Sequence, residues 1–248
     1  MCIRGRGMKF RGKNKTRRLR STRRRRQRGG KSKHIAHAHV ISLETSTDRY
    51  TVLEKQAKAA GLELKRFSVT KPSYEIVGNL EALLRVGGST FINKVNLHAN
   101  PDLLGTVGCF MSHRDLLRKI SKEEGSSKIA LILEDDAIIP EDALGKIDVL
   151  VNGLPPDWHI CFLGKNEVDS VAYKENIVKL TNRFNPSRNY GTWAYLVHVP
   201  HIELILNCLE RISDALDTQY NYYTDRINTY LAKPNIIEVN MKIKSTRF

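Results

Sequence analysis

The sequence has few cysteines and no long apolar run, and each absence argues against a class of protein. Its four cysteines form no Cys-x-x-Cys pair and no cluster with histidine at metal-ligand spacing, so neither a disulfide framework nor a zinc finger is expected. No run of about 18 apolar residues is present, so no membrane-spanning helix is expected. No apolar segment of signal-peptide length follows the basic N-terminus. We therefore expect a protein of the cytosol or of a cytosolic membrane surface, with virion or nuclear association also open.

Acidic residues are absent from residues 1–33, which hold 16 Lys or Arg. The whole chain carries 41 basic and 26 acidic side chains, so the other 215 residues keep 25 basic and all 26 acidic ones and are close to neutral. Such a basic segment with few apolar residues is predicted to be a disordered tail. It is expected to bind a polyanion, either nucleic acid or an anionic membrane, through counterion release. The plainer alternative is a solvated extension without a function.

Strand and helix patterns alternate after the tail, which predicts one α/β domain over residues 34–248. A strand at 36–43, a helix ending at Gly61 and a strand at 62–69 would form a β-α-β unit with parallel strands. Further strands are expected at 129–133, 158–163, 192–199 and 236–239, and helices at 112–120, 142–151, 200–212 and 217–231, with 70–108 as loops around short helices. The predicted fold therefore has a mostly parallel central sheet covered by helices.

Three consecutive acidic residues, Glu134, Asp135 and Asp136, directly follow the apolar run at 129–133. Carboxylates packed side by side next to a buried strand repel one another and lose hydration, a cost that a bound cation offsets. In open parallel sheets the ligand crevice lies at the carboxyl ends of the strands. Oxygen ligands there suit Mg²⁺ or Mn²⁺. The plainer alternative is that the acids begin a loop or cap the helix after Pro140.

Five blocks follow one another along the chain in a fixed order. They are Val40-Ile41-Ser42-Leu43 with Asp48-Arg49, Gly108-Cys109-Phe110-Met111-Ser112-His113, Leu131 to Ala137 with the acidic run, Gly191-Thr192-Trp193-Ala194-Tyr195, and Leu216-Asp217 with Asn221-Tyr222-Tyr223 and Pro234. Together they resemble the ordered motifs of glycosyltransferase family 25, which contains lipopolysaccharide, lipooligosaccharide and procollagen galactosyltransferases. Thr106 departs from the pattern, since the family commonly has a Gly-Glu pair shortly before Gly-Cys.

The resemblance implies a GT-A fold, in which one α/β domain binds a nucleotide sugar. It also implies a UDP-sugar donor, most often UDP-galactose, a Mn²⁺ or Mg²⁺ cofactor, and inversion at the anomeric carbon. The metal and diphosphate ligands would be Glu134 and Asp136, with Asp135 near the ribose or sugar. An inverting transfer needs a base for the proton of the acceptor hydroxyl. Asp217 is the candidate, with a helix N-cap as the structural alternative.

The same resemblance assigns roles to the other matched residues. Ser42, Asp48, Arg49 and His113 would contact the donor nucleotide together with Asp135, and Gly191, Thr192 and Trp193 would line the acceptor or sugar pocket. Structural alternatives stay open: surface capping for Asp48, a helix-terminal role for His113, and core packing for Trp193.

The leading hypothesis is a metal-dependent glycosyltransferase that moves a hexose from a UDP-sugar to a glycan or protein hydroxyl. The alternative is a nucleic-acid- or virion-associated binding protein that keeps a degenerate transferase fold and acts through its basic tail. A metal-dependent phosphohydrolase is disfavoured, because the sequence shows no convincing nucleophile and no second acidic cluster.

Overall fold

Strands and helices alternate along the chain, as the sequence predicts. The computed structural model describes residues 32–35, 37–73, 101–123, 128–166, 169–181 and 190–242, with the side chains of 101–103 left out. The elements are β1 (His37–Leu43), α1 (Thr47–Ala60), β2 (Glu63–Val69), α3 (Pro101–Lys122), β3 (Ile129–Glu134), β4 (Ala137–Ile138), α4 (Ala143–Gly153), β5 (Ile160–Asn166), β6 (Ser170–Lys174), β7 (Ile177–Leu180), β8 (Tyr190–His198), η3 (Val199–His201), α5 (Ile202–Cys208), α6 (Leu216–Tyr222), β9 (Thr229–Ala232) and β10 (Glu238–Val239).

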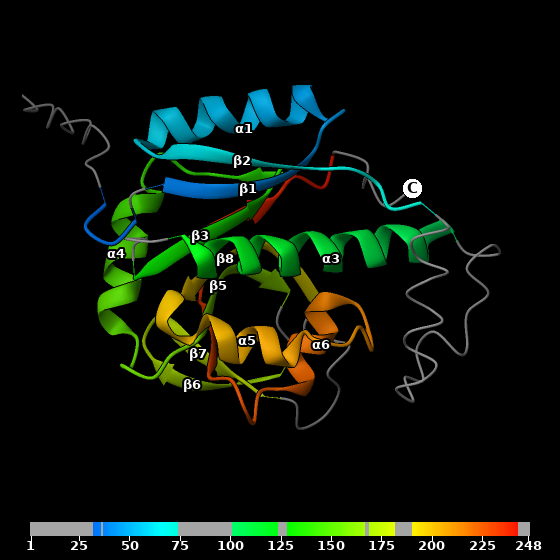
Figure 1. The fold of residues 1–248 in the computed structure, drawn as a ribbon. Coiled ribbons are helices and arrows are strands. Elements are labelled where there is room, and N and C mark those ends of the chain that lie inside the picture. Colours follow the sequence, from blue (N-terminus) through cyan, green and yellow to red (C-terminus); the bar gives the residue numbers. More distant parts are fainter. Residues whose placement is uncertain are drawn as a thin grey trace, which may run out of the picture.

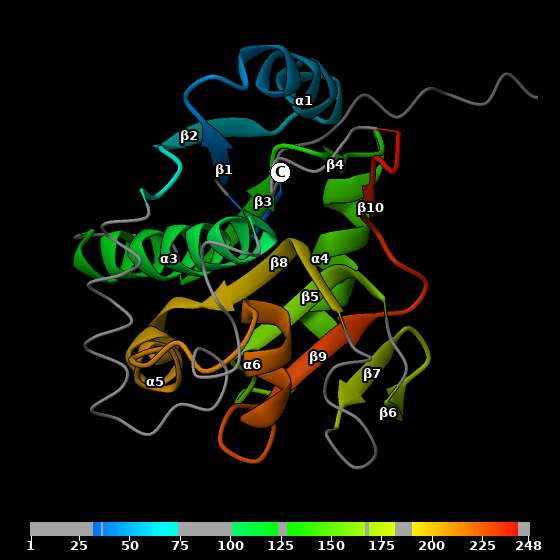
Figure 2. The same cartoon turned by 90° about the vertical axis from the view of Figure 1, so that its right-hand side faces the viewer.

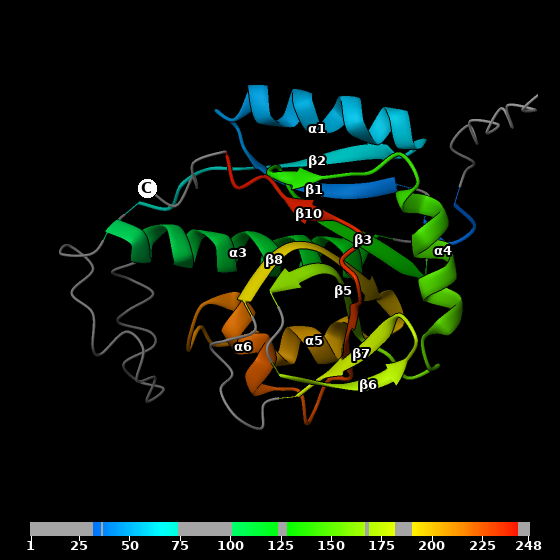
Figure 3. The ribbon, with the colours of Figure 1, turned by 180° about the vertical axis from the view of Figure 1, so that it is seen from behind.

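An eight-stranded sheet in the order β2-β1-β3-β8-β5-β9-β7-β6 runs through the molecule (Figure 1). β1 is parallel to both β2 and β3, and β5 is parallel to β9, whereas β8 is antiparallel to β3 and β5. Among the described strands of this sheet, only β7 and β8 run against the others. The prediction of an α/β fold with a mostly parallel central sheet is confirmed. The short strands β4 and β10 pair with each other in a separate two-stranded sheet (Figure 2, and from behind in Figure 3).

Helices cover both faces of the sheet and make a three-layer arrangement (Figure 2). α3, α5 and α6 pack on one face, where Phe110, Ile205 and Tyr220 meet Ile132 and Phe162. The helices α1 and α4 pack on the other face, where their apolar residues meet Leu131 and Leu133 of β3. β3 is buried on both faces up to its last residue, as expected of a central strand that reads as one continuous apolar run.

Three predicted helices were wrong in their extent. α3 begins at Pro101 rather than at Ser112, because Val107, Phe110 and Leu117 form one buried face at helical spacing that outweighs the glycines between them. Ser112 therefore lies inside the helix and donates its hydroxyl to the Gly108 carbonyl at 2.7 Å.

The helix expected at 217–231 ends at Tyr222, and residues 229–232 form the buried strand β9. The helix expected at 200–212 is shorter, with a 3₁₀ turn at 199–201 before α5. The prediction for 70–108 is wrong at its carboxyl end, where α3 occupies 101–108, and residues 74–100 lie outside the described residues.

Only the end of the predicted basic tail belongs to the described residues. Ser32 donates its hydroxyl to Asp148 of α4 at 2.5 Å, and the Lys33 amide donates to the other carboxylate oxygen at 3.1 Å. Residues 1–31 lie outside the described part, so the prediction of a disordered tail stays a prediction. No helix among the described residues is both long enough and apolar enough to cross a membrane.

Candidate active site

A cleft opens at the edge of the sheet where β1 and β3 end. Because the two strands are parallel and Ile41 is in register with Glu134, the end of β1 and the acidic run after β3 meet at the same edge. The lining residues come from these two strand ends, from α1, from α3 and from the segment after β2: Ile41, Ser42, Leu43, Arg49, Val69, Thr70, Lys71, Pro72, Gly105, Gly108, Cys109, Ser112, His113, Glu134, Asp135 and Asp136.

Arg49 pairs with two of the three acids. Its Nη2 atom lies 3.0 Å from Asp135 Oδ1 and 3.3 Å from Asp136 Oδ2. Arg49 is in the first turn of α1, which follows β1 after a short turn, so the parallel sheet brings its side chain to the acidic run although about 85 residues separate them in the chain. The Ser42 hydroxyl also hydrogen-bonds Asp135, and it accepts a hydrogen bond from Arg66 at 3.2 Å.

The acidic run carries more negative charge than its neighbours neutralise. Burial raises the pKa of Asp136 to about 7, and repulsion from Glu134 and Asp135 adds to this effect, while Arg49 opposes it. Burial also raises the pKa of Asp135, against the opposing effects of Arg49 and Ser42. The Asp136 Oδ1 atom is buried without a hydrogen-bond partner. A cation placed at this atom would relieve both the desolvation and the repulsion.

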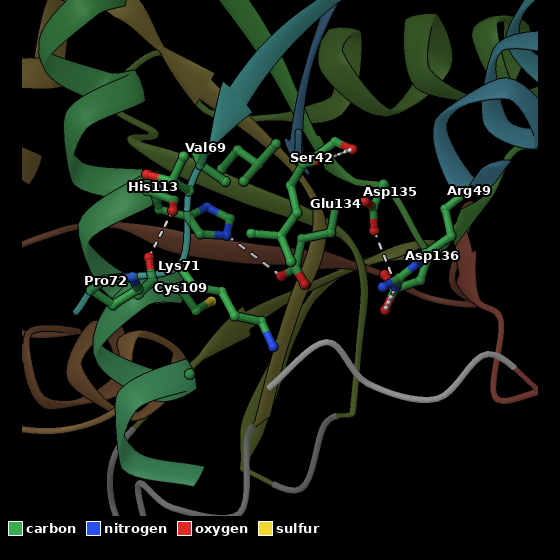
Figure 4. Close-up of a pocket in the computed structure, with 16 residues that line it drawn as sticks. Ser42, Arg49, Val69, Lys71, Pro72, Cys109, His113, Glu134, Asp135 and Asp136 are labelled. Atoms are coloured by element: carbon green, nitrogen blue, oxygen red, sulfur yellow. Dashed lines mark hydrogen bonds and ion pairs between the residues drawn. The ribbon is translucent and has the colours of Figure 1, made fainter. Parts of the chain in front are cut away.

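Glu134 is turned away from the other two acids (Figure 4). One of its carboxylate oxygens accepts a 2.6 Å hydrogen bond from the Thr192 hydroxyl and lies 3.5 Å from His113 Nε2. His113 is fully buried in the middle of α3, and its Nδ1 atom lies 2.8 Å from the Tyr195 hydroxyl. The helix-terminal role that was the structural alternative for His113 is therefore wrong, and the side chain does line the cleft.

Asp217 is held by two backbone amides. Its Oδ2 atom accepts from the Gly191 amide at 2.8 Å, and its Oδ1 atom accepts from the Thr218 amide at 2.9 Å. The N-cap of α6 is Ala215, so Asp217 lies in the first turn and is not the cap itself. Lys165 donates to the Gly191 carbonyl at 3.3 Å. Burial lowers the pKa of Lys165 to about 8, against the opposing effect of Asp217.

Gly191 has a backbone that no other residue would adopt without strain. Its φ is +103°, and a Cβ atom there would lie 2.0 Å from the Trp193 ring. Trp193 is 6% exposed and donates its indole Nε1 to the Ile237 carbonyl at 3.0 Å. Glycine at position 191 therefore allows a backbone in which the Gly191 amide donates to Asp217 and the Thr192 hydroxyl donates to Glu134.

The structure brings most of the predicted donor residues together. Ser42, Arg49, His113, Glu134, Asp135 and Asp136 all line the cleft. The residues predicted for the acceptor or sugar pocket, Gly191, Thr192 and Trp193, do not line it, although Thr192 donates to Glu134. Asp48 is exposed in the first turn of α1 and does not line it either.

Three side chains near the cleft carry chemistry that the sequence did not single out. Cys109 lines the cleft one helical turn before His113, and Lys71 lines it from the segment after β2. Lys165 stands close to Asp217 although it is only 2% exposed. The role of Cys109 could have been predicted, because residues four apart in a helix lie on the same face and Cys109 is four residues before His113. Lys165 follows the apolar residues of β5, and the sequence around it does not indicate that it lies close to Asp217.

Two groups of side chains in the cleft can hold a metal ion. The acids offer hard oxygen ligands, which suit Mg²⁺ and Mn²⁺. Cys109, His113 and Glu134 offer three atoms that lie within 4.8 Å of one another, a mixed set that suits softer transition metals.

One family model matches most of the chain. The model of glycosyltransferase family 25, described as an LPS biosynthesis protein, matches residues 35–220. Procollagen galactosyltransferases 1-B and 1-A of Xenopus laevis are 26% and 25% identical over 113 residues, which cover 44% of this chain and 18% of each relative. The matched stretch thus spans less than a fifth of those relatives.

Solved structures align with much of this chain at low sequence identity. A glycosyltransferase involved in glycosylation of the major capsid of PBCV-1 aligns with 84% of this chain and 94% of its own at a TM-score of 0.47 and 10% identity. The apo glycosyltransferase GlyE of Streptococcus pneumoniae aligns with 79% of this chain and 45% of its own, with a TM-score of 0.39 and 10% identity.

Proposed function

The chain belongs to glycosyltransferase family 25, and from this premise we propose that it transfers a hexose, with galactose as the leading candidate, from a UDP-sugar to a hydroxyl of a glycan or protein. The observation that carries the proposal is the cleft at the ends of β1 and β3, which three carboxylates line and where Arg49 pairs with two of them. A crevice at the carboxyl ends of parallel strands is where α/β sheets bind nucleotides.

The acidic run fits a divalent ion. Asp136 has a buried oxygen without a partner and a raised pKa, and its neighbours supply further oxygen ligands. We infer that Asp136 and Glu134 hold Mn²⁺ or Mg²⁺ and the donor diphosphate. Such an ion would supply charge neutralisation for the departing diphosphate.

Arg49 and Lys71 complete the charge balance of the cleft. Both are cations that line it beside the acids. Arg49 holds Asp135 and Asp136 in place at 3.0 and 3.3 Å, so that the carboxylates are oriented before the donor binds. Lys71 adds a positive charge that would attract the donor's phosphates.

Asp217 is proposed as the base that takes the acceptor proton in an inverting transfer. Both of its oxygens accept backbone amides, which fixes its orientation. Gly191 and Thr192 connect it to Glu134 through two hydrogen bonds. Lys165 lies beside the Asp217–Gly191 bond, and the charge of Asp217 opposes the lowering of the Lys165 pKa by burial.

Equilibrium binding of UDP-sugars, with and without Mn²⁺, tests the donor half of the proposal. We expect UDP-galactose to bind in the presence of Mn²⁺ and to bind at least about tenfold more weakly to Asp136→Asn, since charged metal ligands dominate such sites. Asp142→Asn is the matched control, because this exposed carboxylate pairs with Lys146 on α4. Equal binding to wild type and Asp136→Asn would refute the assignment of the acidic run.

The basic segment supports a separate binding function. Its 16 Lys or Arg residues in 33 positions favour contact with a polyanion. Removal of residues 1–31 keeps the contacts of Ser32 and Lys33 with Asp148. We expect this truncation to abolish nucleic-acid or anionic-vesicle binding and to leave donor binding intact. Loss of both would favour the alternative in which the tail carries the main activity.

A further inference from the structure

Two histidines and a glutamate form a cluster at the edge of the sheet opposite to the cleft. His37 and His39 belong to the first half of β1, and Glu123 follows the last residue of α3. One possible ligand atom from each lies within 4.8 Å of the other two. The two imidazole rings are 4.9 Å apart, edge to face.

The fold itself brings these three residues together. Alternate residues of a strand point to the same face, so His37 and His39 share the face on which Ile41 packs with the apolar residues of α3. α3 crosses this face and ends beside the start of β1 (Figure 1). Glu123 therefore lies close to the two histidines, although α3 begins 64 residues after His37 in the chain.

We propose that His37, His39 and Glu123 bind one zinc ion or a related divalent transition-metal ion. Two imidazoles and one carboxylate are a ligand set that proteins use for Zn²⁺, with water in the fourth position. Bonds of about 2.0–2.1 Å in a tetrahedron place neighbouring ligand atoms about 3.3 Å apart. The three side chains therefore need to approach by about 1 Å, which side-chain torsions supply.

The surroundings of the cluster are compatible with a cation. Burial lowers the pKa of both histidines, that of His39 to about 4, so the rings keep a free lone pair at neutral pH. In the described part of the chain, neither imidazole makes a hydrogen bond. Lys65 and Lys119 add positive charge nearby, and Glu63, the parallel neighbour of His37, offsets part of it.

A metal ion here would tie α3 to β1. α3 carries Cys109, Ser112 and His113, and β1 ends at Ser42, so the two elements form two walls of the cleft. Bound metal would therefore brace the cleft from the opposite edge. The inference does not depend on the proposed function, since it rests on three residues that lie outside the cleft.

Cobalt titration of the full, chelator-treated chain tests the proposal, because Co²⁺ absorbs strongly in four-coordinate sites and shows an added near-ultraviolet band when a thiolate binds it. We expect one equivalent with the four-coordinate spectrum and no thiolate band, displaced by Zn²⁺. His37→Ala and Glu123→Gln should each weaken binding at least about tenfold, the lower end of the loss seen for altered metal sites. His34→Ala, which removes a histidine that is not part of the cluster and contacts Asn152, should bind as wild type.

Cys109→Ser separates this cluster from the mixed ligand set in the cleft. Unchanged cobalt absorption in Cys109→Ser supports the proposal, whereas a thiolate band that disappears in this variant would overturn it. Absence of a four-coordinate spectrum in wild type, or full retention of that spectrum in His37→Ala and Glu123→Gln, would overturn it as well. Circular dichroism of the metal-free variants tests whether a loss of cobalt binding comes from a failure to fold. Zn²⁺ should raise the Tm of wild type but not that of Glu123→Gln.

Discussion

Replacement of Asp136 by Asn should stabilise the metal-free protein at neutral and higher pH while it weakens donor binding. The ionised carboxylate is costly to the folded state, because burial, with repulsion from Glu134 and Asp135, raises the pKa of Asp136 from 3.8 to about 7. Asn keeps the shape of the protonated side chain without its charge. The residue that we assign to the metal is thus expected to lower stability in the absence of a ligand.

The expected gain in the free energy of unfolding for Asp136→Asn follows from the pKa shift of Asp136. Each pKa unit corresponds to about 1.4 kcal/mol, so the ionised group costs at most about 4 kcal/mol. A fifth of the side chain is exposed, and solvent screening reduces the expected gain to about 2–3 kcal/mol. The pKa of Asp136 is higher in the folded state than in the unfolded state. The free energy of unfolding of wild type therefore falls as the pH rises from about 4 to 7, and the fall is complete above pH 7.

Urea unfolding in the presence of a chelator measures the difference directly. At about pH 4.5 the two proteins should unfold at nearly the same urea concentration, and at about pH 8 the Asn variant should be more stable. Added Mn²⁺ should stabilise wild type and reduce or reverse the gap. Asp142→Asn, which changes an exposed carboxylate, should show no such pH-dependent gain. A variant that is less stable than wild type at pH 8, or a gap that is the same at both pH values, would refute the reasoning.

Three further substitutions test the segment that joins the two halves of the site. Gly191→Ala should lower the free energy of unfolding by at least about 2 kcal/mol, because the residue has a positive φ and its new Cβ would meet the Trp193 ring; a Tm equal to that of wild type would contradict this. Thr192→Val removes the hydroxyl that donates to Glu134 and should cost about 1.5–3 kcal/mol in urea unfolding, with Thr192→Ser close to wild type. Asp217→Asn should lower kcat about 10²- to 10⁴-fold with donor affinity unchanged, as expected for loss of a general base; an equal fall in donor affinity would instead indicate a structural role.

The position of the acidic run could be predicted from the sequence, but its contacts could not. An apolar run long enough for one buried strand ends at Glu134, and the structure ends β3 at that residue. The pairing of Arg49 with Asp135 and Asp136, and of Glu134 with Thr192, depends on which strands become neighbours in the sheet. Local patterns carry no information on that order.

The errors in the predicted elements have physical causes as well. Gly105 and Gly108 interrupt the helical pattern of α3, but the buried face continues through them. The residues of β6 are mostly exposed, so that strand lacks the apolar alternation by which strands are recognised. β9 is four residues long and buried throughout, and a short apolar run of this kind is equally compatible with a helix.

Turnover of a UDP-sugar by the purified full chain tests the central claim most directly. Release of UDP should require Mn²⁺ or Mg²⁺ and should be lost when Glu134 and Asp136 are both changed to Ala, while the Asp142→Asn control keeps the wild-type rate. UDP release that is independent of metal, or that persists in the Glu134→Ala, Asp136→Ala double variant, would contradict the assignment of the acidic run as the centre of glycosyl transfer.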